Sequence, residues 1–576
     1  MTLAPGPVST HLGGPLSEHV AAAAAQLARS TPYSVELVTQ DVVWAAGSSR
    51  LFQDYRGDLS GRYLDAVDAA LAMGLAVDRD KAAAVLAAVL GAQQPDGLFG
   101  PPALSTQVDQ GSAWGHGRLL DGLLSARSWA PDRLTGTLEH ATAQLAVAIA
   151  ARTTAWGRWV GAAGRQKFRL DPFSVVLPLA RYAAAAGSEP AADAALDAAL
   201  ALAEALPEDV ERAHMHGYLL ALRGQVEVGR LTGADHLVQD ALARVEVVAD
   251  RYQLPHGGVP ESVSLPWDVN TEGCGIADWV MLNLRLHELT GEEALLDRAV
   301  VAAVNALLHT QRASGHFGCE TLSGESGVLV SDYAPEAWWC CTFHGLRALH
   351  HLAERAVTVD DDAVRLHVPI ATTRHDDDGA TVVEVTGDYP YDDVVTVTAG
   401  RALRAGGLWL RVPPTASVAE LRVDGEPVRA DAAGGWVRLP APPPGSRVTL
   451  RLRQHEWFSV AGTPMVPPFA NTTLPAPDLS DRPVAVFRGP LLLAAGAADN
   501  DTEDVLRGRF LVHPREQPAL ARDDDGRELA TVSGHDSFHA SLRLAPLAGA
   551  DRARNDRAVR AWFGGLRYER PGLHGH

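Results

Sequence analysis

Residues 60–73 read SGRYLDAVDAALAM, with apolar side chains at three- and four-residue spacing along the segment. This spacing is typical of a helix with one apolar face. The pattern recurs through the first 355 residues, which are rich in Ala and Leu and divided by Gly/Pro/Asp loops. It predicts about twelve helices, at residues 18–29, 60–73, 81–92, 116–126, 138–151, 172–186, 191–206, 213–231, 236–249, 274–289, 294–309 and 341–356.

No alternating strand pattern interrupts these helices. Paired helices in this number favour an (α/α)6 toroid, a barrel of helix pairs that carries its site at the centre. An α-solenoid of stacked helix pairs is the alternative, but the segments show no fixed repeat period. We therefore expect residues 1–355 to form an (α/α)6 catalytic barrel.

The pattern changes near Val357, where apolar and polar residues begin to alternate. Turn sequences such as VDGE at residues 423–426 separate the alternating segments. This arrangement predicts an α + β multidomain protein, in which antiparallel β-sandwich domains at 356–460 and 461–576 follow the barrel. Strands are expected at residues 380–385, 394–398, 407–412, 420–423, 435–439, 447–452, 484–495 and 558–563, and loops at 463–481 and 523–528.

The composition describes a globular protein and limits its partners. Of the 576 residues, 47% are hydrophobic and 21% charged, and the formal net charge is −20. This charge argues against binding to nucleic acid, which requires clustered Lys and Arg, and is compatible with a small-molecule carbohydrate substrate. The sequence shows no signal-peptide pattern and no apolar run of transmembrane length, so no membrane association is expected. With only four cysteines, the chain fits a reducing cytoplasm, and a homodimer is compatible with these features.

All four cysteines fall between Cys274 and Cys341, which suggests a soft-metal site or a reactive thiol. Glu272, Cys274, Cys340 and Cys341 supply three thiols and one carboxylate, a ligand set that suits tetrahedral Zn²⁺. Ordinary buried cysteines and a disulfide are the competing interpretations. Cys319 could replace Cys274 as a ligand, but packing alone also explains it.

Glu261 is a candidate general acid, since residues 257–262, GGVPES, form a Gly/Pro loop just before the Glu272 motif. A carboxylate held there could protonate a leaving group, while a metal-bound thiolate facing a cavity could act as a nucleophile. The alternative is a solvated loop glutamate without a chemical role.

Histidines and tryptophans near the predicted helix starts are candidates for contacts with a sugar. His116, His214 and His216 could hydrogen-bond sugar hydroxyls, although each alone is more often structural. Trp267 and Trp339 flank the candidate site and could stack on a sugar ring, although large aromatics usually belong to the core.

These residues resemble the motifs of family 127 glycoside hydrolases, the β-L-arabinofuranosidases. EGC at 272–274 resembles the family's Glu-Thr-Cys, and the pair at 340–341 its Cys-Cys. PESV at 260–263 resembles its acid/base segment. Further matches lie along most of the chain, in QQPDGL at 93–98, GHGRLL at 115–120, TGDYPY at 386–391, LRVP at 410–413 and VAVFRGPL at 484–491.

The resemblance implies an (α/α)6 barrel with β-sandwich domains and a retaining exo-glycosidase. It implies Cys340 as the nucleophile and Glu261 as the acid/base. Glu272, Cys274, Cys340 and Cys341 would hold zinc.

The sequence departs from the family pattern around the expected sugar pocket. CCTFH at 340–344 stands where the family has Cys-Cys-Pro-Pro-Asn, so that His344 joins the expected substrate contacts. DPF at 171–173 stands in place of His-Pro-Glu, and the loop from Glu261 to Glu272 is short. Two alternatives to a glycosidase stay open. One is a non-catalytic zinc-stabilised carbohydrate-binding protein, and the other is a lyase or epimerase on a similar barrel.

Overall fold

The structure is a computed structural model that describes residues 10–29, 33–43, 55–100, 110–155, 167–263, 270–323, 328–331, 339–360, 363–376, 378–400, 407–460, 484–496, 511–512, 519–522, 528–533, 541–547, 558–560 and 564–565. Trp267, the expected loop at 463–481 and all but the last residue of the expected loop at 523–528 lie outside these ranges.

The predicted helices are all confirmed, most of them with ends that differ by a few residues. Within the helix predicted at residues 294–309, residues 302–307 form the π-helical segment η2, which is wound more loosely than an α-helix. A short helix, α2, was not predicted. The described helices are α1 (Gly14–Ala28), α2 (Val35–Thr39), α3 (Asp58–Ala72), α4 (Arg79–Leu90), α5 (Gln110–Ala126), α6 (Asp132–Ala150), η1 (Asp171–Val175), α8 (Val176–Ala186), α9 (Pro190–Glu204), α10 (Met215–Thr232), α11 (Asp235–Arg251), α12 (Gly273–Thr290), α13 (Glu293–Val301), η2 (Ala302–Leu307) and α14 (Trp339–Ala356).

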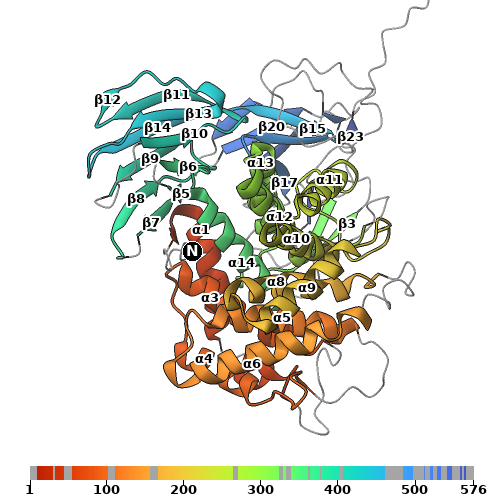
Figure 1. Cartoon of the computed structure of the whole chain (residues 1–576). Helices are drawn as coiled ribbons and strands as arrows, with labels where there is room; N and C mark the ends of the chain where they lie inside the picture. Colours follow the sequence, from red (N-terminus) through yellow and green to blue (C-terminus); the bar gives the residue numbers. More distant parts are fainter. Residues whose placement is uncertain are drawn as a thin grey trace, which may run out of the picture.

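Six of the described helices form a closed ring in which each packs against the next. The order around the ring is α3, α5, α8, α10, α12 and α14, and α14 returns to α3. Outer helices pack on this ring, as α6 does on α5 and α9 on α8 (Figure 1). The sequence reflects this division, since α11 buries one stripe that includes Leu237, Ala241 and Val245, whereas α12 is buried around most of its circumference.

Glycines allow two ring helices to approach backbone to backbone. A Cβ at Gly122 of α5 would lie 2.3 Å from the carbonyl oxygen of Gly61 on α3. A Cβ at Gly61 would in turn lie 2.4 Å from the carbonyl oxygen of Arg118. Both glycines therefore serve the packing of α3 on α5.

Strands follow the ring of helices from Val357 onward. Strands lie at every predicted position, but the segment predicted at 484–495 forms two strands, β16 and β17, joined by a turn at residues 489–490, and of the segment predicted at 558–563 only residues 558–560 are described. One sheet has the order β1-β7-β8-β9-β14-β11-β12, and a second has the order β13-β10-β6-β5. Strand β9 buries every second residue, as half-covered sheets do. The strands are β5 (Val357–Val359), β6 (Val364–Leu366), β7 (Thr372–His375), β8 (Thr381–Thr386), β9 (Val394–Ala399), β10 (Gly407–Arg411), β11 (Ala416–Val423), β12 (Glu426–Pro427), β13 (Trp436–Pro440), β14 (Arg447–Gln454), β15 (Glu456–Val460), β16 (Val484–Arg488), β17 (Leu491–Gly496), β18 (Leu511–Val512), β19 (Ala519–Arg522), β20 (Glu528–Ser533), β21 (Ser541–Pro546), β22 (Ala558–Arg560) and β23 (Gly564–Gly565).

The expectation that no strand interrupts the helical part was wrong. Strands β1 (Thr10–Leu12), β2 (Asn270–Glu272), β3 (Cys319–Ser323) and β4 (Val328–Ser331) lie within it. β1 pairs with β7, and β4 pairs with β22 near the end of the chain. Strands of three to five residues are too short for alternation to stand out, and several of their pairing partners, such as β7 for β1 and β22 for β4, are distant in sequence.

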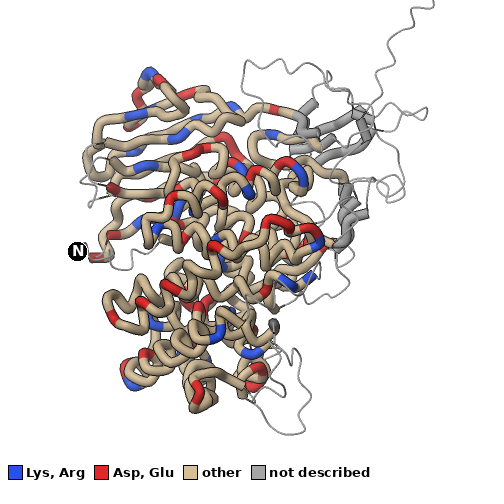
Figure 2. The backbone as a smooth tube through the Cα atoms, turned by 45° about the vertical axis from the view of Figure 1, so that its right-hand side comes forward, with Lys and Arg blue, Asp and Glu red and all other residues tan. Residues whose placement is uncertain are grey.

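The described part of the chain contains no helix with the length and hydropathy needed to cross a membrane. Acidic and basic residues are interspersed over the described helices and strands in Figure 2.

The close packing of α3 on α5 predicts a specific cost for one added methyl group. Gly122→Ala should lower the free energy of unfolding by about 1–3 kcal/mol, because the new Cβ has no room against Gly61. Gly136→Ala on α6 is the control. No atom lies within 4 Å of its Cβ position, so the helix should gain up to about 1 kcal/mol from the better helix former. Chemical denaturation of both variants measures the difference, and equal effects would contradict the packing argument.

Candidate metal centre and active site

The first turns of two ring helices bring the cysteines together. Cys274 is the second residue of α12, and Cys340 and Cys341 are the second and third residues of α14. Glu272 precedes α12 as its N-cap residue, at the end of β2. A Cβ at Gly273 would lie 3.1 Å from Cβ of Cys341, so this glycine lets the two helix starts meet.

The side chains of Glu272, Cys274, Cys340 and Cys341 form one donor cluster. One donor atom from each residue lies within 4.8 Å of all the others. The Sγ atoms of Cys274 and Cys341 are 3.6 Å apart, and those of Cys340 and Cys341 are 3.9 Å apart. Sulfurs at ~2.3 Å from a tetrahedral Zn²⁺ would be separated by ~3.8 Å. The cluster therefore has the donor types and the spacing that such a cation requires.

All four cysteines are free thiols, so a disulfide between them is excluded as an account of the cluster. Burial raises the pKa of Cys274 well above its ordinary value. Neutral thiols beside a carboxylate, two of them buried and one partly exposed, gain little from one another, whereas a bound cation would hold them as thiolates. Cys319 lies outside the donor cluster. It pairs with Glu272 across β2 and β3, and its carbonyl oxygen accepts from Arg312.

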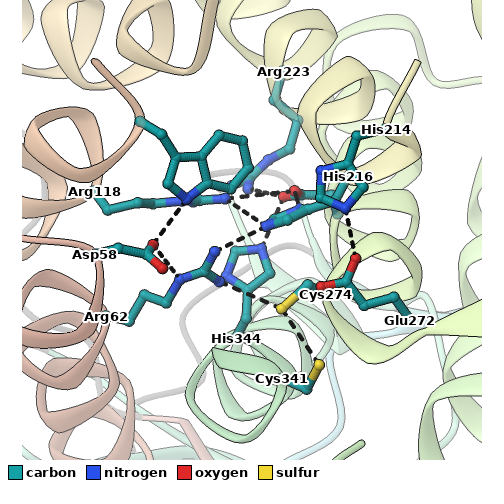
Figure 3. Close-up of polar contacts among 12 residues, drawn as sticks. Asp58, Arg62, Arg118, His214, His216, Arg223, Glu272, Cys274, Cys341 and His344 are labelled. Atoms are coloured by element: carbon teal, nitrogen blue, oxygen red, sulfur yellow. Dashed lines mark hydrogen bonds and ion pairs between the residues drawn. The ribbon is translucent and has the colours of Figure 1, made fainter. Parts of the chain in front are cut away.

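Glu272 also belongs to a second cluster, with His214 and Glu261. The Nε2 atom of His214 lies 2.8 Å from Glu272 Oε2 (Figure 3). Burial disfavours the charged forms of both groups, but His214 holds the pKa of Glu272 down at about 2, and Glu272 raises the pKa of His214 above its ordinary value. The two side chains thus form an ion pair next to the thiols.

Backbone hydrogen bonds position Glu261 beside this pair. Its N–H donates to Asn270 O, and its carbonyl oxygen accepts from the N–H of Met215 at the start of α10. The Glu261 carboxylate contacts Lys167, whose Nζ lies 2.6 Å from Oε1. The Glu261 side chain is 26% exposed, so it can reach a molecule that enters the site.

Arg62 of α3 connects the thiol cluster to the interior of the helix ring. Its NH1 group donates to Cys274 Sγ at 3.5 Å, and its Nε group donates to Asp58 at 2.7 Å. Asp58 also accepts from the indole N–H of Trp114 at 3.0 Å. The buried guanidinium thus lies where it can offset negative charge on the cluster (Figure 3).

Asp278 of α12 organises two histidines. Its Oδ2 atom accepts from His216 Nδ1 at 2.5 Å, and its Oδ1 atom accepts from His344 Nε2 at 3.0 Å and from Arg223 at 2.5 Å. Burial favours the protonated carboxyl, but His344, His216 and Arg223 hold the pKa of Asp278 well below its ordinary value. Arg62 and Arg118 both donate to His216 Nε2 at 3.0 Å, which places the ring proton on Nδ1.

Of the histidines predicted to contact a sugar, three lie near the cysteines and one lies apart from them. His214, His216 and His344 lie with the cysteine cluster, and both ring nitrogens of His216 already have protein partners. His116 is fully buried, its Nε2 atom accepting from Phe99 N–H and its Nδ1 atom donating to the Ser112 carbonyl. Trp339 is 9% exposed at the start of α14.

Sequence reasoning missed the charged residues that surround these histidines. Arg62, Arg118, Asp278 and Lys167 were not predicted, although three of them stand on helices whose other side chains are mainly apolar. A charged residue on the buried face of such a helix is a usable signal, because an isolated buried charge is costly and implies a partner.

Asp171 is a further buried acid next to the site, at the start of η1. Its Oδ1 atom accepts no hydrogen bond from the described residues. Burial raises its pKa to about 7, and the neighbouring His214 opposes this shift only in part. Asp171 stands where the family resemblance has a histidine.

No family model matches the sequence, and no curated protein matches it. Solved structures do match. A GH127 β-L-arabinofuranosidase from Geobacillus stearothermophilus T6 superposes with a TM-score of 0.70 at 16% identity, covering 97% of this chain and 100% of that one. The chain has the fold of this enzyme. A structure described as a glycoside hydrolase gives 0.68 at 16% identity, over 98% of this chain and 97% of that one, and a GH127 β-arabinofuranosidase gives 0.67 at 15%, over 97% and 98%.

The buried carboxyl of Asp171 predicts a pH-dependent stability. Its pKa is about 7 in the folded chain, above that of an unfolded aspartate, so the cost of its ionisation appears as the pH rises from about 4 and is complete above about 7. Asp171→Asn removes this cost. Between pH 5 and pH 8 the stability of the variant relative to the wild type should rise by about 2–3 kcal/mol. Denaturation at both pH values measures the gain, with the exposed Asp431→Asn as control; a parallel pH response of the two variants would contradict the argument.

Proposed function

We propose that the chain is a retaining exo-glycoside hydrolase that releases a terminal furanose, with β-L-arabinofuranose as the first candidate sugar. The observation that carries the proposal is the placement of three thiols and a second carboxylate, that of Glu261, around Glu272. Glu272 shares one cluster with the cysteines and another with Glu261 and His214. The fold, shared with structures described as β-L-arabinofuranosidases, supports the same reaction class.

Zinc is the proposed metal, held by Glu272, Cys274, Cys340 and Cys341. The sulfur spacing and the three-thiol, one-carboxylate donor set support this choice. Bound zinc would keep the thiols ionised. Arg62, which donates to Cys274, offsets part of the negative charge that three thiolates and one carboxylate bring to the centre.

Cys340 is the proposed nucleophile, because it is partly exposed whereas Cys341 is fully buried. Its thiolate attacks C1 of the sugar while Glu261 gives a proton to the glycosidic oxygen, so that the C1–O bond breaks as the C1–S bond forms. Glu261, now ionised, takes a proton from water. The water oxygen then attacks C1 and the C1–S bond breaks, which returns Cys340 and retains the anomeric configuration.

The remaining polar groups are proposed to bind and orient the sugar. The Nδ1 atom of His214 has no hydrogen-bond partner among the described residues, so it can bond to a hydroxyl. His344, Trp339 and Trp267 are kept as proposed substrate contacts. The pairing of His216 with two arginines and Asp278 favours a positioning role, and the hydrogen bonds of His116 favour a structural one.

We also propose that the closed ring of helices is the (α/α)6 barrel expected from the sequence, with the strands after Val357 in two β-sandwich domains. The contacts that return from α14 to α3 support the barrel. The free thiols support a reducing compartment such as the cytoplasm. A homodimer stays a hypothesis that rests on the sequence alone.

Zinc content tests the metal assignment. Protein purified without added metal should carry one zinc per chain, as measured by elemental analysis. Cys274→Ser should lower this content, since it removes one of the clustered sulfurs, and Cys319→Ser should not, since Cys319 lies outside the cluster. Less than about a tenth of an equivalent in folded wild-type protein, or equal losses in both variants, would overturn the assignment.

The role of Glu261 is tested by the leaving group. Glu261→Gln should reduce kcat/KM by about 10²–10⁴-fold on an alkyl furanoside, whose leaving oxygen must be protonated. The loss should be smaller on a nitrophenyl furanoside, which departs readily without a proton. Glu208→Gln, a change at an exposed glutamate in the loop before α10, should leave both rates unaltered. Near-wild-type rates of Glu261→Gln on the alkyl substrate would remove Glu261 from the mechanism, and absence of any hydrolysis by the wild type would favour the non-catalytic rival.

A further inference from the structure

A cavity of about 440 Å³ lies at the end of the helix ring opposite the cysteine cluster. Helices α10, α12 and α14 begin beside the cysteines, and the residues that line the cavity come several turns later. Arg285, for example, follows Cys274 by eleven positions on α12, which is about 16 Å along the helix. Arg374 of β7 and Thr358 of β5 complete the lining, so the cavity lies between the helices and one strand from each of the first two sheets.

Arginine–aspartate pairs form the floor of this cavity and separate it from the candidate active site. Each pair joins two neighbouring helices of the ring, and the three arginines line the cavity. The pairs are Arg181 with Asp121, Arg223 with Asp278, and Arg347 with Asp65. Each floor arginine has at least one carboxylate for its charge, and Arg347 also lies 3.7 Å from a second, Asp68. The other charged groups of the lining are left to balance one another.

The carboxylates that line the cavity are already engaged. Glu227 accepts from Arg285 and Arg230, and Glu288 accepts from Arg285. Glu354 faces the rings of His350 and His351, with N–O distances of 3.7 and 3.5 Å.

Guanidinium N–H groups, by contrast, are in excess. Arg355 makes one hydrogen bond, from Nε to His287 Nδ1, and Arg223 makes one, from NH1 to Asp278. The remaining N–H groups of these two arginines meet no acceptor among the described residues. None of these nitrogens is both fully buried and unpartnered, so the groups face open space.

The electrostatics show that Arg355 is only partly compensated by its surroundings. Burial lowers the pKa of Arg355, Glu288 and Glu293 oppose this only in part, and no carboxylate forms an ion pair with it among the described residues. Burial and the nearby Arg347 also hold the pKa of His351 well below its ordinary value, so this ring stays neutral at the cavity wall. A guanidinium with this environment is stabilised by an anion that fits its planar N–H pairs.

We propose that this cavity is a binding site for a small multivalent oxyanion, a phosphate or a carboxylate, held by Arg355 and Arg223. Its volume admits an inorganic phosphate, a dicarboxylate or a phosphorylated small molecule and is too small for a polymer chain. The site stands apart from the proposed glycosidase chemistry and does not depend on it. Arg223 joins the two ends of the ring, because its partner Asp278 holds His216 and His344.

Calorimetric titration of the full chain with inorganic phosphate and, separately, with succinate tests the proposal at constant ionic strength. Saturable binding of either anion, with chloride ineffective, is the expected result, and the stronger of the two identifies the chemical class. Arg355→Gln should weaken the binding at least about tenfold, since charge-assisted hydrogen bonds are lost. Arg422→Gln, which removes an exposed arginine of β11 paired with Glu420, is the control and should bind as the wild type does.

Glu354→Gln provides a test in the opposite direction that does not depend on the stability of Arg355→Gln. It removes one carboxylate from the lining at an exposed position, so the anion should bind several-fold more tightly. Absence of saturable binding to the wild type, equal affinities of the Arg355 and Arg422 variants, or unchanged or weaker binding by Glu354→Gln would overturn the proposal.

Discussion

The buried carboxylate of Asp278 is the interaction on which the centre of this molecule depends. It accepts hydrogen bonds from His216 of α10, His344 of α14 and Arg223 of α10, while it stands on α12 itself. A fully buried carboxylate is costly unless several donors satisfy it. The need to satisfy this one group therefore ties three helices of the ring together and fixes the orientation of both histidines.

The direction of the ring helices explains why the reactive groups gather at one end. Arg62, His216, Cys274 and Cys341 all lie within the first two turns of their helices, whereas Arg118 lies near the middle of α5. The amino-terminal ends of these helices thus converge, and the positive ends of their dipoles favour the negative charge that thiolates and carboxylates bring. At the opposite end α8, α10, α12 and α14 present arginine side chains to the cavity, so each end of the ring has its own chemistry.

The fold matches those of structures described as glycoside hydrolases although only 15–16% of the residues are identical. Close helix contacts such as that of Gly61 with Gly122, and the apolar stripes of the outer helices, can be met by many sequences. A metal-binding or catalytic site tolerates fewer changes of residue type than helix packing does. The better guide to function is therefore the donor cluster of Glu272, Cys274, Cys340 and Cys341. Asp171 and His344 mark the places where this chain departs from the family pattern, and both lie beside the cluster or its histidines.

The sequence by itself determined the helices, most strands and the cysteine cluster, because these depend on short-range patterns. Helical spacing predicted α3 and α11, alternation predicted β9, and the unusual concentration of thiols pointed to Cys274, Cys340 and Cys341. Only the tertiary structure decided the partners of distant residues. The pairing of β1 with β7, the ring closure of α14 on α3, the two guanidiniums on His216 and the contact of Lys167 with Glu261 join segments far apart in the chain. His116 is a second example. A histidine at this place in the sequence could contact a sugar, but in the structure its ring nitrogens are hydrogen-bonded to Phe99 and Ser112, which favours a structural role. The physical reason is that a side chain's charge, exposure and free lone pairs are set by what packs around it, and local sequence patterns carry no record of those neighbours.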